Sequence, residues 1–195
     1  DDGKMNVNSQ LTKRLVDIIK QLDPTRPVTA GCNEPSPENL LFKSNALDLI
    51  GYNYHIKDIK DVPKNFPGKP FIMTESVSAL QTRGFYMMPS DSVYKAPEEW
   101  WLPYSNPTFM CSAYDNMHAS WSSTHESTWN VVKNNHFVSG QFVWTGWDYL
   151  GEPTPYGFPA RSSYFGIIDL AGFPKDIYYM YQSEWTQKPV LHLFP

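Results

Sequence analysis

Cysteines, long apolar runs and basic clusters are scarce or missing in this sequence. The 195 residues include only two cysteines, Cys32 and Cys111, which are too few for a disulfide framework. A single pair could form, but two buried free thiols fit the composition better. No apolar run approaches the roughly 20 residues that cross a bilayer, so we expect no membrane partner. With 16 basic and 20 acidic residues and no Lys/Arg run, the sequence lacks the electrostatic footprint of a nucleic-acid-binding protein.

Aromatic residues, in contrast, are abundant, with seven Trp, twelve Tyr and eleven Phe. A chain of this length can form one domain with a sizeable hydrophobic core, and most of the rings belong in such a core. Some rings could instead form flat platforms for a sugar, whose C–H faces pack on aromatic planes. Composition by itself favours the core interpretation.

Short apolar strands alternate with helices along the chain. Apolar residues at helical spacing predict a helix over 9–21, with Asn8 or Ser9 as its cap and Asp23-Pro24 after its end. The other expected elements are strands at 26–31, 48–54, 71–74 and 140–144, helices at 121–135 and 176–185, a helical turn at 40–42 and an extended piece at 165–169. Residues 81–111 show no such pattern, which indicates a functional loop or a misjudged segment.

This alternation predicts an α/β fold with a parallel sheet. Each expected strand ends on polar or aromatic residues, namely Asn33-Glu34, Tyr54-His55, Glu75-Ser76, and Trp144 with Trp147-Asp148. In a (β/α) barrel, the carboxyl ends of the strands build the active site. Four strand ends of this kind are hard to explain by packing alone, so we expect a functional site there.

A carboxylate at a strand end among aromatic residues favours glycoside hydrolysis. Retaining glycosidases use two carboxyl groups about 5–5.5 Å apart, of which one attacks the sugar and the other transfers protons. The attacking group must stay ionised, so it needs hydrogen-bond donors such as a tyrosine hydroxyl. Glu75 fits the attacking role, and Tyr54, one strand earlier, fits the donor role. The residues alone leave open that Glu75 caps a turn and that Tyr54 is a core tyrosine.

A set of segments in order along the chain is similar to the catalytic barrel of glycoside hydrolase family 2, in its bacterial β-galactosidase branch. The segments are Leu22 to Ala30, Ile50 to Tyr54, Gly68-Lys69-Pro70, Thr74-Glu75-Ser76, Gly140 to Tyr149, Phe165 to Asp169 and Gly172 to Asp176. The resemblance implies that residues 1–195 are the second half of a (β/α)8 TIM barrel, with strands five to eight and their helices. The upstream half and the accessory β-domains would then lie outside this chain, which begins with Asp1 and not with Met.

The resemblance also assigns roles to four residues. Glu75 corresponds to the nucleophile, Tyr54 to the tyrosine that hydrogen-bonds it, and Trp144 to the tryptophan that stacks on the sugar; Trp147 is a second candidate for that platform. Two positions depart from the family. Many members have a His where this chain has Ser78, and well-known β-galactosidases have a sugar-contacting Asn in place of Phe165. Both departures leave the identity of the sugar more open than the type of reaction.

The pair Asn33-Glu34 imitates the acid/base motif of the family, an Asn followed by the catalytic Glu. In the family this motif precedes the helix that leads to the Asp-Pro-Thr-Arg-Pro segment. Here that helix is expected at 9–21, and Glu34 comes after it. We therefore reject Glu34 as the acid/base, and we expect that residue upstream of this chain and the isolated segment to be inactive.

The resemblance implies a retaining, exo-acting glycosidase, most simply a β-galactosidase, with a carbohydrate substrate and the upstream half of the barrel as partners. A homo-oligomer and a periplasmic or secreted location are compatible with it. The alternatives are a β-glucuronidase or β-mannosidase of the same family, or a non-catalytic carbohydrate-binding relative. Arg83 and Arg161 are the loop arginines available for a uronic acid. We expect no cofactor and no metal, because His125-Glu126 lacks the second His of a zinc-protease motif.

Overall fold

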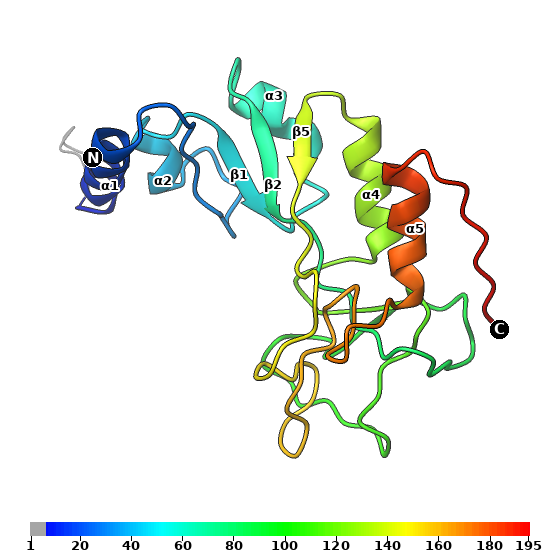
Figure 1. Cartoon of the computed structure of the whole chain (residues 1–195). Helices are drawn as coiled ribbons and strands as arrows, with labels where there is room; N and C mark the ends of the chain where they lie inside the picture. The colour runs from blue at the N-terminus through cyan, green and yellow to red at the C-terminus, as the bar shows by residue number, and fades with distance from the viewer. Residues whose placement is uncertain (1–6) are drawn as a thin grey trace. The chain divides into compact units, whose positions relative to one another are not determined.

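The computed structural model describes residues 7–195, which fall into two compact units (Figure 1). The first unit runs to Ser76 and includes Val131–Phe142, and the second comprises Val77–Asn130 and Val143–Pro195. The fold is mixed α/β, as the alternating pattern predicts. The sheets are parallel, and the elements of each unit are described separately below.

The first unit contains a three-stranded parallel sheet in the order β1-β2-β5, with β1 at Ile50–Asn53, β2 at Phe71–Glu75 and β5 at Val138–Gln141. Figure 1 shows these strands side by side. The strands predicted at 48–54 and 71–74 are confirmed. The strand predicted at 140–144 begins and ends earlier, so Trp144 lies beyond the strand and not at its end.

An aromatic cluster packs around this sheet. Tyr52 and Phe71 are fully buried, with ring centroids 5.0 Å apart. Phe42, from the short helix α2 (Leu40–Lys43), lies 6.0 Å from Tyr52, and Phe66 lies 4.9 Å from Phe42. Phe66 directly follows α3 (Val62–Asn65), which continues a 3₁₀ turn at Ile59–Asp61. Burial of these rings is the main apolar stabilisation of the strands that carry Tyr54 and Glu75.

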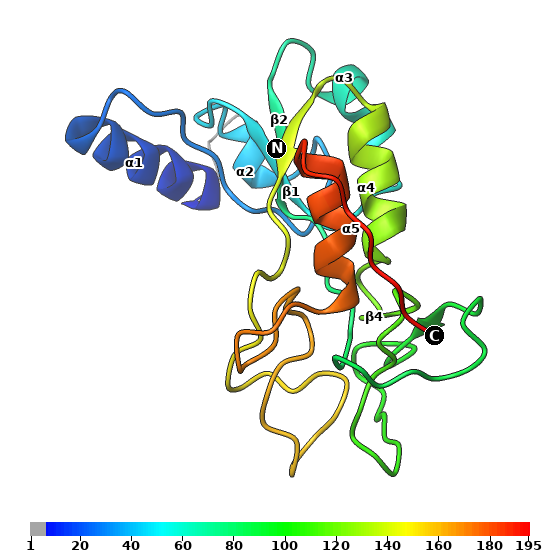
Figure 2. The ribbon, with the colours of Figure 1, turned by 45° about the vertical axis from the view of Figure 1, so that its right-hand side comes forward.

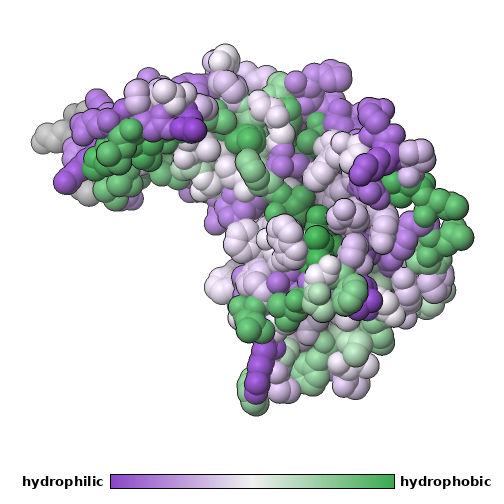
Figure 3. Space-filling model, viewed as in Figure 1, coloured by the Kyte–Doolittle hydropathy of each residue, from purple (hydrophilic) through white to green (hydrophobic). Residues whose placement is uncertain are grey.

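The helix α1 (Val7–Leu22) confirms the helix predicted over 9–21. Its predicted cap is wrong, because Asn8 and Ser9 both lie inside its first turns and the Ser9 hydroxyl donates to the Leu40 carbonyl at 3.0 Å. One face of α1 is buried against this unit, but another exposes Leu11, Leu15, Ile18, Ile19 and Leu22. Figure 3 shows this apolar surface in green along the helix. A helix with such an uncovered apolar face is normally covered by a further part of its protein.

The strand predicted at 26–31 is wrong. This segment instead runs along the free edge of β1 with only scattered pairing: the Val28 carbonyl accepts the Asp48 N–H at 2.9 Å, and the Cys32 carbonyl accepts the Asn53 N–H at 2.8 Å. A single bridge joins Cys32 to Tyr52. Pro27 has no N–H to donate, and Val28 donates its own N–H to the Asp48 carboxylate. The segment therefore lies where a fourth parallel strand would lie, without a regular ladder.

The second unit is built around the apolar cluster Leu80, Ala96, Cys111, Met117, Ala119, Tyr156 and Phe165. The irregular region 81–111 contains one short strand, β3 (Tyr94–Lys95), which pairs in parallel with β4 (Met117–His118). The extended piece predicted at 165–169 is confirmed, because the Ile167 N–H donates to the Thr145 carbonyl at 3.1 Å and a parallel bridge joins Ile168 to Trp147. Cys111 and Cys32 are both buried free thiols, as the composition indicates. Burial raises the pKa of the Cys111 thiol to about 12.

Two helices confirm the remaining predictions. The helix α4 (His125–Asn134) begins in the second unit, and α5 (Asp176–Trp185) lies beside it in both ribbon views (Figure 2). His125 is fully buried between them, with its Nδ1 2.9 Å from the Tyr181 hydroxyl. Burial lowers the pKa of His125 to about 3, so it is a neutral core histidine.

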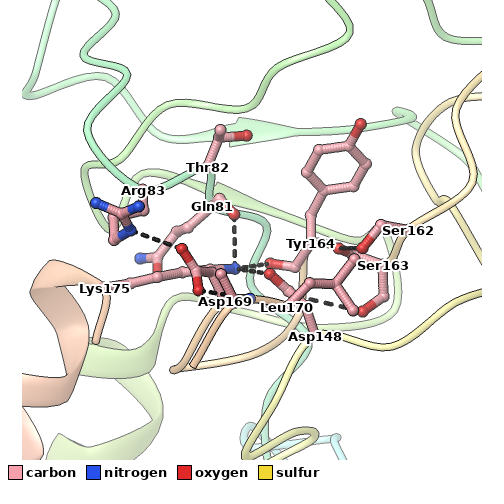
Figure 4. Close-up of a pocket in the computed structure, with 11 residues that line it drawn as sticks. Gln81, Thr82, Arg83, Asp148, Ser162, Ser163, Tyr164, Asp169, Leu170 and Lys175 are labelled. Atoms are coloured by element: carbon pink, nitrogen blue, oxygen red, sulfur yellow. Dashed lines mark hydrogen bonds and ion pairs between the residues drawn. The ribbon is translucent and has the colours of Figure 1, made fainter. Parts of the chain in front are cut away.

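A buried ion pair precedes α5. The Lys175 ammonium lies 2.7 Å from the Asp148 carboxylate and also donates to the carbonyls of Gln81 at 2.7 Å and Tyr164 at 3.1 Å. Figure 4 shows these three acceptors around the ammonium, at the edge of a pocket of about 290 Å³. Lys175 therefore links three segments that are distant in sequence to the start of α5.

We expect Lys175→Met to destabilise the protein by about 3–5 kcal/mol, because Asp148 would be left buried without its counter-charge. The measurement is chemical denaturation of the full-length protein, followed by tryptophan fluorescence. Lys188→Met, at an exposed position after α5, is the matched control and should leave the midpoint unchanged. Equal midpoints for the two variants would contradict a structural role for the ion pair.

Candidate active site

Glu75 and Tyr54 meet at the carboxyl ends of two neighbouring parallel strands. Glu75 is the last residue of β2, and Tyr54 directly follows β1. The Tyr54 hydroxyl donates to Glu75 Oε2 at 2.7 Å, and the Asn53 amide donates to Glu75 Oε1 at 3.1 Å. Each oxygen of this half-buried carboxylate thus accepts a hydrogen bond. The contact between Tyr54 and Glu75 is the one that the sequence predicts.

A β-bulge in β2 creates this arrangement. Tyr52 pairs with Met73, but the next residue of β1, Asn53, pairs with Glu75, so Thr74 is the extra residue. In such a bulge two residues of one strand lie opposite one residue of the other, and the side chains are redirected. Thr74 and Glu75 therefore both face Asn53, and the Thr74 hydroxyl donates to Asn53 Oδ1 at 2.7 Å.

The chain leaves β1 in an unusual backbone conformation. Tyr54 and His55 have φ angles of 57° and 55°, in the left-handed region that side chains other than glycine rarely adopt. Such residues cost of order 1–3 kcal/mol each and cluster at functional sites. The Tyr54 N–H donates to the Glu75 carbonyl at 2.5 Å, so backbone and side chain of Tyr54 both contact Glu75. The strain is thus located where the Tyr54 hydroxyl is directed at the carboxylate.

Two donors, one on each oxygen, hold the carboxylate in one orientation. An ionised, oriented and partly accessible carboxylate is what nucleophilic attack on a sugar carbon requires. Sequence reasoning missed Asn53 as part of this group. A signal was present, because Asn53 is a polar residue at the end of an apolar strand. The bulge in β2 that brings Glu75 opposite Asn53 cannot be seen in the sequence.

Trp144 and Trp147 belong to the second unit and are described within it. The Trp144 indole N–H donates to the Tyr149 hydroxyl at 3.1 Å, and the ring packs against the apolar cluster of that unit. Tyr149 in turn donates to the Glu152 carboxylate. Trp144 is therefore held in place with part of its ring accessible, whereas Trp147 is 63% exposed.

Glu34 has a different environment from Glu75. It is exposed, and its carboxylate accepts a hydrogen bond from the Asn39 amide at 3.4 Å. It lines a groove of about 560 Å³ together with residues of α1 and α2. The partner of the Glu34 carboxylate is thus Asn39, the cap residue of the short helix α2.

Known proteins resemble this chain in sequence and in structure. No family model matches the sequence. The chain is 65% identical over 194 residues to β-galactosidase BoGH2A of Bacteroides ovatus, a match that covers 100% of this chain and 23% of that protein. The chain belongs to glycoside hydrolase family 2.

Two further relatives agree with this family. A β-glycosidase from Bacteroides vulgatus has a solved structure that superposes with a TM-score of 0.76 at 30% identity, over 100% of this chain and 26% of that one. A β-glucuronidase of Bacteroides fragilis is 23% identical over 190 residues, which are 94% of this chain and 25% of that protein. The chain thus spans about a quarter of the length of these relatives.

The two departures from the family pattern have structural explanations. Phe165 is 1% exposed and belongs to the apolar cluster of the second unit, so this position is a core position here. Ser78 is fully buried, and its N–H donates to the Ser122 hydroxyl at 2.6 Å. Both side chains are therefore buried in the second unit.

Histidines and acidic residues do not gather into a metal site within residues 7–195: no group of three or more His, Cys, Asp or Glu there could hold an ion. His118 is buried, with its Nδ1 2.8 Å from the Ala119 carbonyl, whereas His136 is exposed. Across the same described residues, no helix is both long and apolar enough to cross a membrane.

We expect Tyr54→Phe to lower kcat/KM of the full-length protein on an aryl β-glycoside by about 10- to 100-fold, the equivalent of one lost hydrogen bond to a charged group. Tyr52→Phe is the matched control, because the Tyr52 hydroxyl donates to the Pro35 carbonyl at 3.1 Å and not to Glu75. Equal losses in the two variants would show that Tyr54 acts only through packing. Steady-state kinetics on purified, folded variants distinguish these outcomes.

Proposed function

We propose that this chain carries the nucleophile of a retaining β-glycosidase that releases terminal sugars, with β-galactosides as the substrate. The observation that supports this most strongly is the double hydrogen bonding of the Glu75 carboxylate by Tyr54 and Asn53 at the ends of parallel strands. A non-catalytic carbohydrate-binding relative would have no need of an oriented carboxylate. The name of the 65% identical relative supports the choice of galactoside.

The proposed reaction is a double displacement. Glu75 attacks the anomeric carbon, and a second carboxyl group protonates the departing glycosidic oxygen, so a glycosyl ester forms on Glu75 as the aglycone leaves. The second group, now ionised, removes a proton from water as the water oxygen bonds to the anomeric carbon. The bond between that carbon and Glu75 breaks, so the free sugar and the Glu75 carboxylate are released. Tyr54 and Asn53 stabilise the carboxylate before attack and after release. Trp144 and, three residues after it, Trp147 supply flat rings for the sugar. The steps need two carboxyl groups and water, and no cofactor.

We also propose that residues 1–195 are the C-terminal part of a TIM-barrel catalytic domain and contain its strands five to eight. In support, the segment at 27–32, β1, β2 and β5 are parallel neighbours in chain order. The uncovered apolar face of α1 and the irregular pairing at 27–32 are what the upstream half of the barrel would cover and complete. That half would supply the acid/base, so the isolated segment is inactive.

The arginines argue for a neutral sugar over a uronic acid. The Arg83 side chain lies 2.6 Å from the Asp169 carboxylate and stacks over Phe173, so its charge is already paired (Figure 4). Arg161 lies over the exposed ring of Phe158. The B. fragilis relative nevertheless keeps a β-glucuronidase as the second candidate. A β-mannosidase has no observation in its favour here.

The first test is Glu75→Gln in the full-length protein, which should reduce hydrolysis by at least about 10⁴-fold, as removal of a nucleophile does. A 2-deoxy-2-fluoro-galactosyl fluoride should label the wild-type protein on the peptide that contains Glu75, as read by mass spectrometry. Glu34→Gln is the matched control and should retain wild-type activity and labelling. Activity in Glu75→Gln, or a label on another residue, would refute the assignment.

The second test is a panel of nitrophenyl β-glycosides with the full-length enzyme. We expect the β-galactoside to have the highest kcat/KM, and the β-glucuronide and β-mannoside to be poorer by at least about 100-fold, because the hydroxyl of a correct sugar satisfies buried polar groups that a wrong sugar leaves unpaired. A preference for the glucuronide would refute the galactoside assignment while leaving the mechanism intact.

A further inference from the structure

The amide of Asn53 lies between a hydroxyl that donates a hydrogen bond and a carboxylate that accepts one. Its Oδ1 accepts the Thr74 hydroxyl at 2.7 Å, and its Nδ2 donates to Glu75 Oε1 at 3.1 Å. Asn53 is only 7% exposed, so protein groups and not bulk water determine its surroundings. The chain Thr74–Asn53–Glu75 therefore runs in one direction, from a hydroxyl donor to a carboxylate acceptor.

This direction is what keeps the donor end of the amide on the carboxylate. The two ends of an asparagine amide have nearly the same shape, so only their partners decide which way the group points. An ionised carboxylate has no proton to give, so a reversed amide would place its carbonyl oxygen against another acceptor. Because the Thr74 hydroxyl donates to Oδ1, it stabilises the orientation in which Nδ2 faces Glu75.

Two glycines, Gly51 and Gly31, pack closely against the side chains of Thr74 and Asn53. The γ-methyl of Thr74 lies close to Gly51: a Cβ added to Gly51 would come within 2.9 Å of it. The methyl therefore packs in the space that Gly51 leaves while the hydroxyl points to Asn53. A Cβ added to Gly31 would lie 2.9 Å from Asn53 Oδ1, so Gly31 closes over the amide. These contacts, together with the bulge at Thr74, hold the amide at one place and in one plane.

We propose that Asn53 is a positioning residue for Glu75 and that the Thr74 hydroxyl sets the orientation of its amide. Asn53 and Tyr54 together hold both carboxylate oxygens, so Glu75 stays in one rotamer at the start of each turnover. This inference rests on the proposed role of Glu75 as nucleophile. It adds a second hydrogen bond that fixes the orientation of that carboxylate, which Tyr54 alone would hold at only one of its two oxygens.

The decisive pair of variants is Thr74→Val and Thr74→Ser in the full-length enzyme. Valine keeps the methyl group and the shape but removes the hydroxyl, whereas serine keeps the hydroxyl. With a dinitrophenyl galactoside, whose leaving group needs no protonation, kcat/KM reports attack by Glu75. We expect Thr74→Val to lower kcat/KM by about fivefold or more, which corresponds to the loss of one hydrogen bond. The acidic limb of the pH profile of kcat/KM should also move to higher pH. Thr74→Ser should keep kcat/KM within about twofold of the wild-type value. The acidic limb of its pH profile should stay in place.

Asn53→Asp provides the second test, because it replaces the donor by a carboxylate next to Glu75. Two carboxylates in contact cannot both ionise easily, so the acidic limb should move up by about one pH unit or more, while KM changes little. A residue with a merely structural role would lower the folded fraction without moving this limb. Thermal unfolding of each variant measures that contribution separately.

Two results would overturn the inference: an acidic limb that stays in place in Asn53→Asp and Thr74→Val, or equal kinetics for Thr74→Val and Thr74→Ser. Should the aspartate variant fail to fold, the Thr74 pair still decides the question, because its two members differ only in which group they keep. Failure of the nucleophile assignment itself has a different signature, namely retained activity in Glu75→Gln. The two failures can therefore be told apart.

Discussion

The pairing of β1 with β2, and the single bulge within it, is the constraint on which the candidate site depends. A regular parallel ladder would place Thr74 opposite Asn53 and leave Glu75 one residue further along. The bulge makes Asn53 the partner of Glu75 while Thr74 still reaches it. All the hydrogen bonds on the carboxylate follow from this register. The aromatic packing of Tyr52 and Phe71 under the same strands keeps the register in place.

Local strain and tertiary packing act together at this edge of the sheet. Tyr54 and His55 adopt left-handed backbone conformations, which neither residue prefers by itself. The buried environment of Tyr54 and its two bonds to Glu75 compensate for that cost. Glu75 is thus held in one orientation by side-chain and backbone contacts from the neighbouring strand. Such preorganisation is what the proposed role of Glu75 as a nucleophile would use.

The second unit shows a different use of charge. Lys175 and Asp148 form a buried pair, and Arg83 is paired with Asp169, so the charges around the pocket in Figure 4 neutralise one another. Such pairs specify how distant segments come together more than they add stability. They also leave that pocket without a free charge, which separates it chemically from the oriented carboxylate of Glu75.

The sequence by itself determined the α/β class, five of the main helices and strands, and the pairing of Tyr54 with Glu75. These features depend on periodicity, on motif order and on residues at strand ends, all of which are local. The tertiary structure decided the rest: the irregular segment at 27–32, the early end of β5 before Trp144, the core position of Phe165 and the role of Asn53. Each of these depends on which groups of a neighbouring segment offer hydrogen bonds or space, and a bulge of one residue, which turns a side chain from one partner to another, leaves no periodic trace in the sequence.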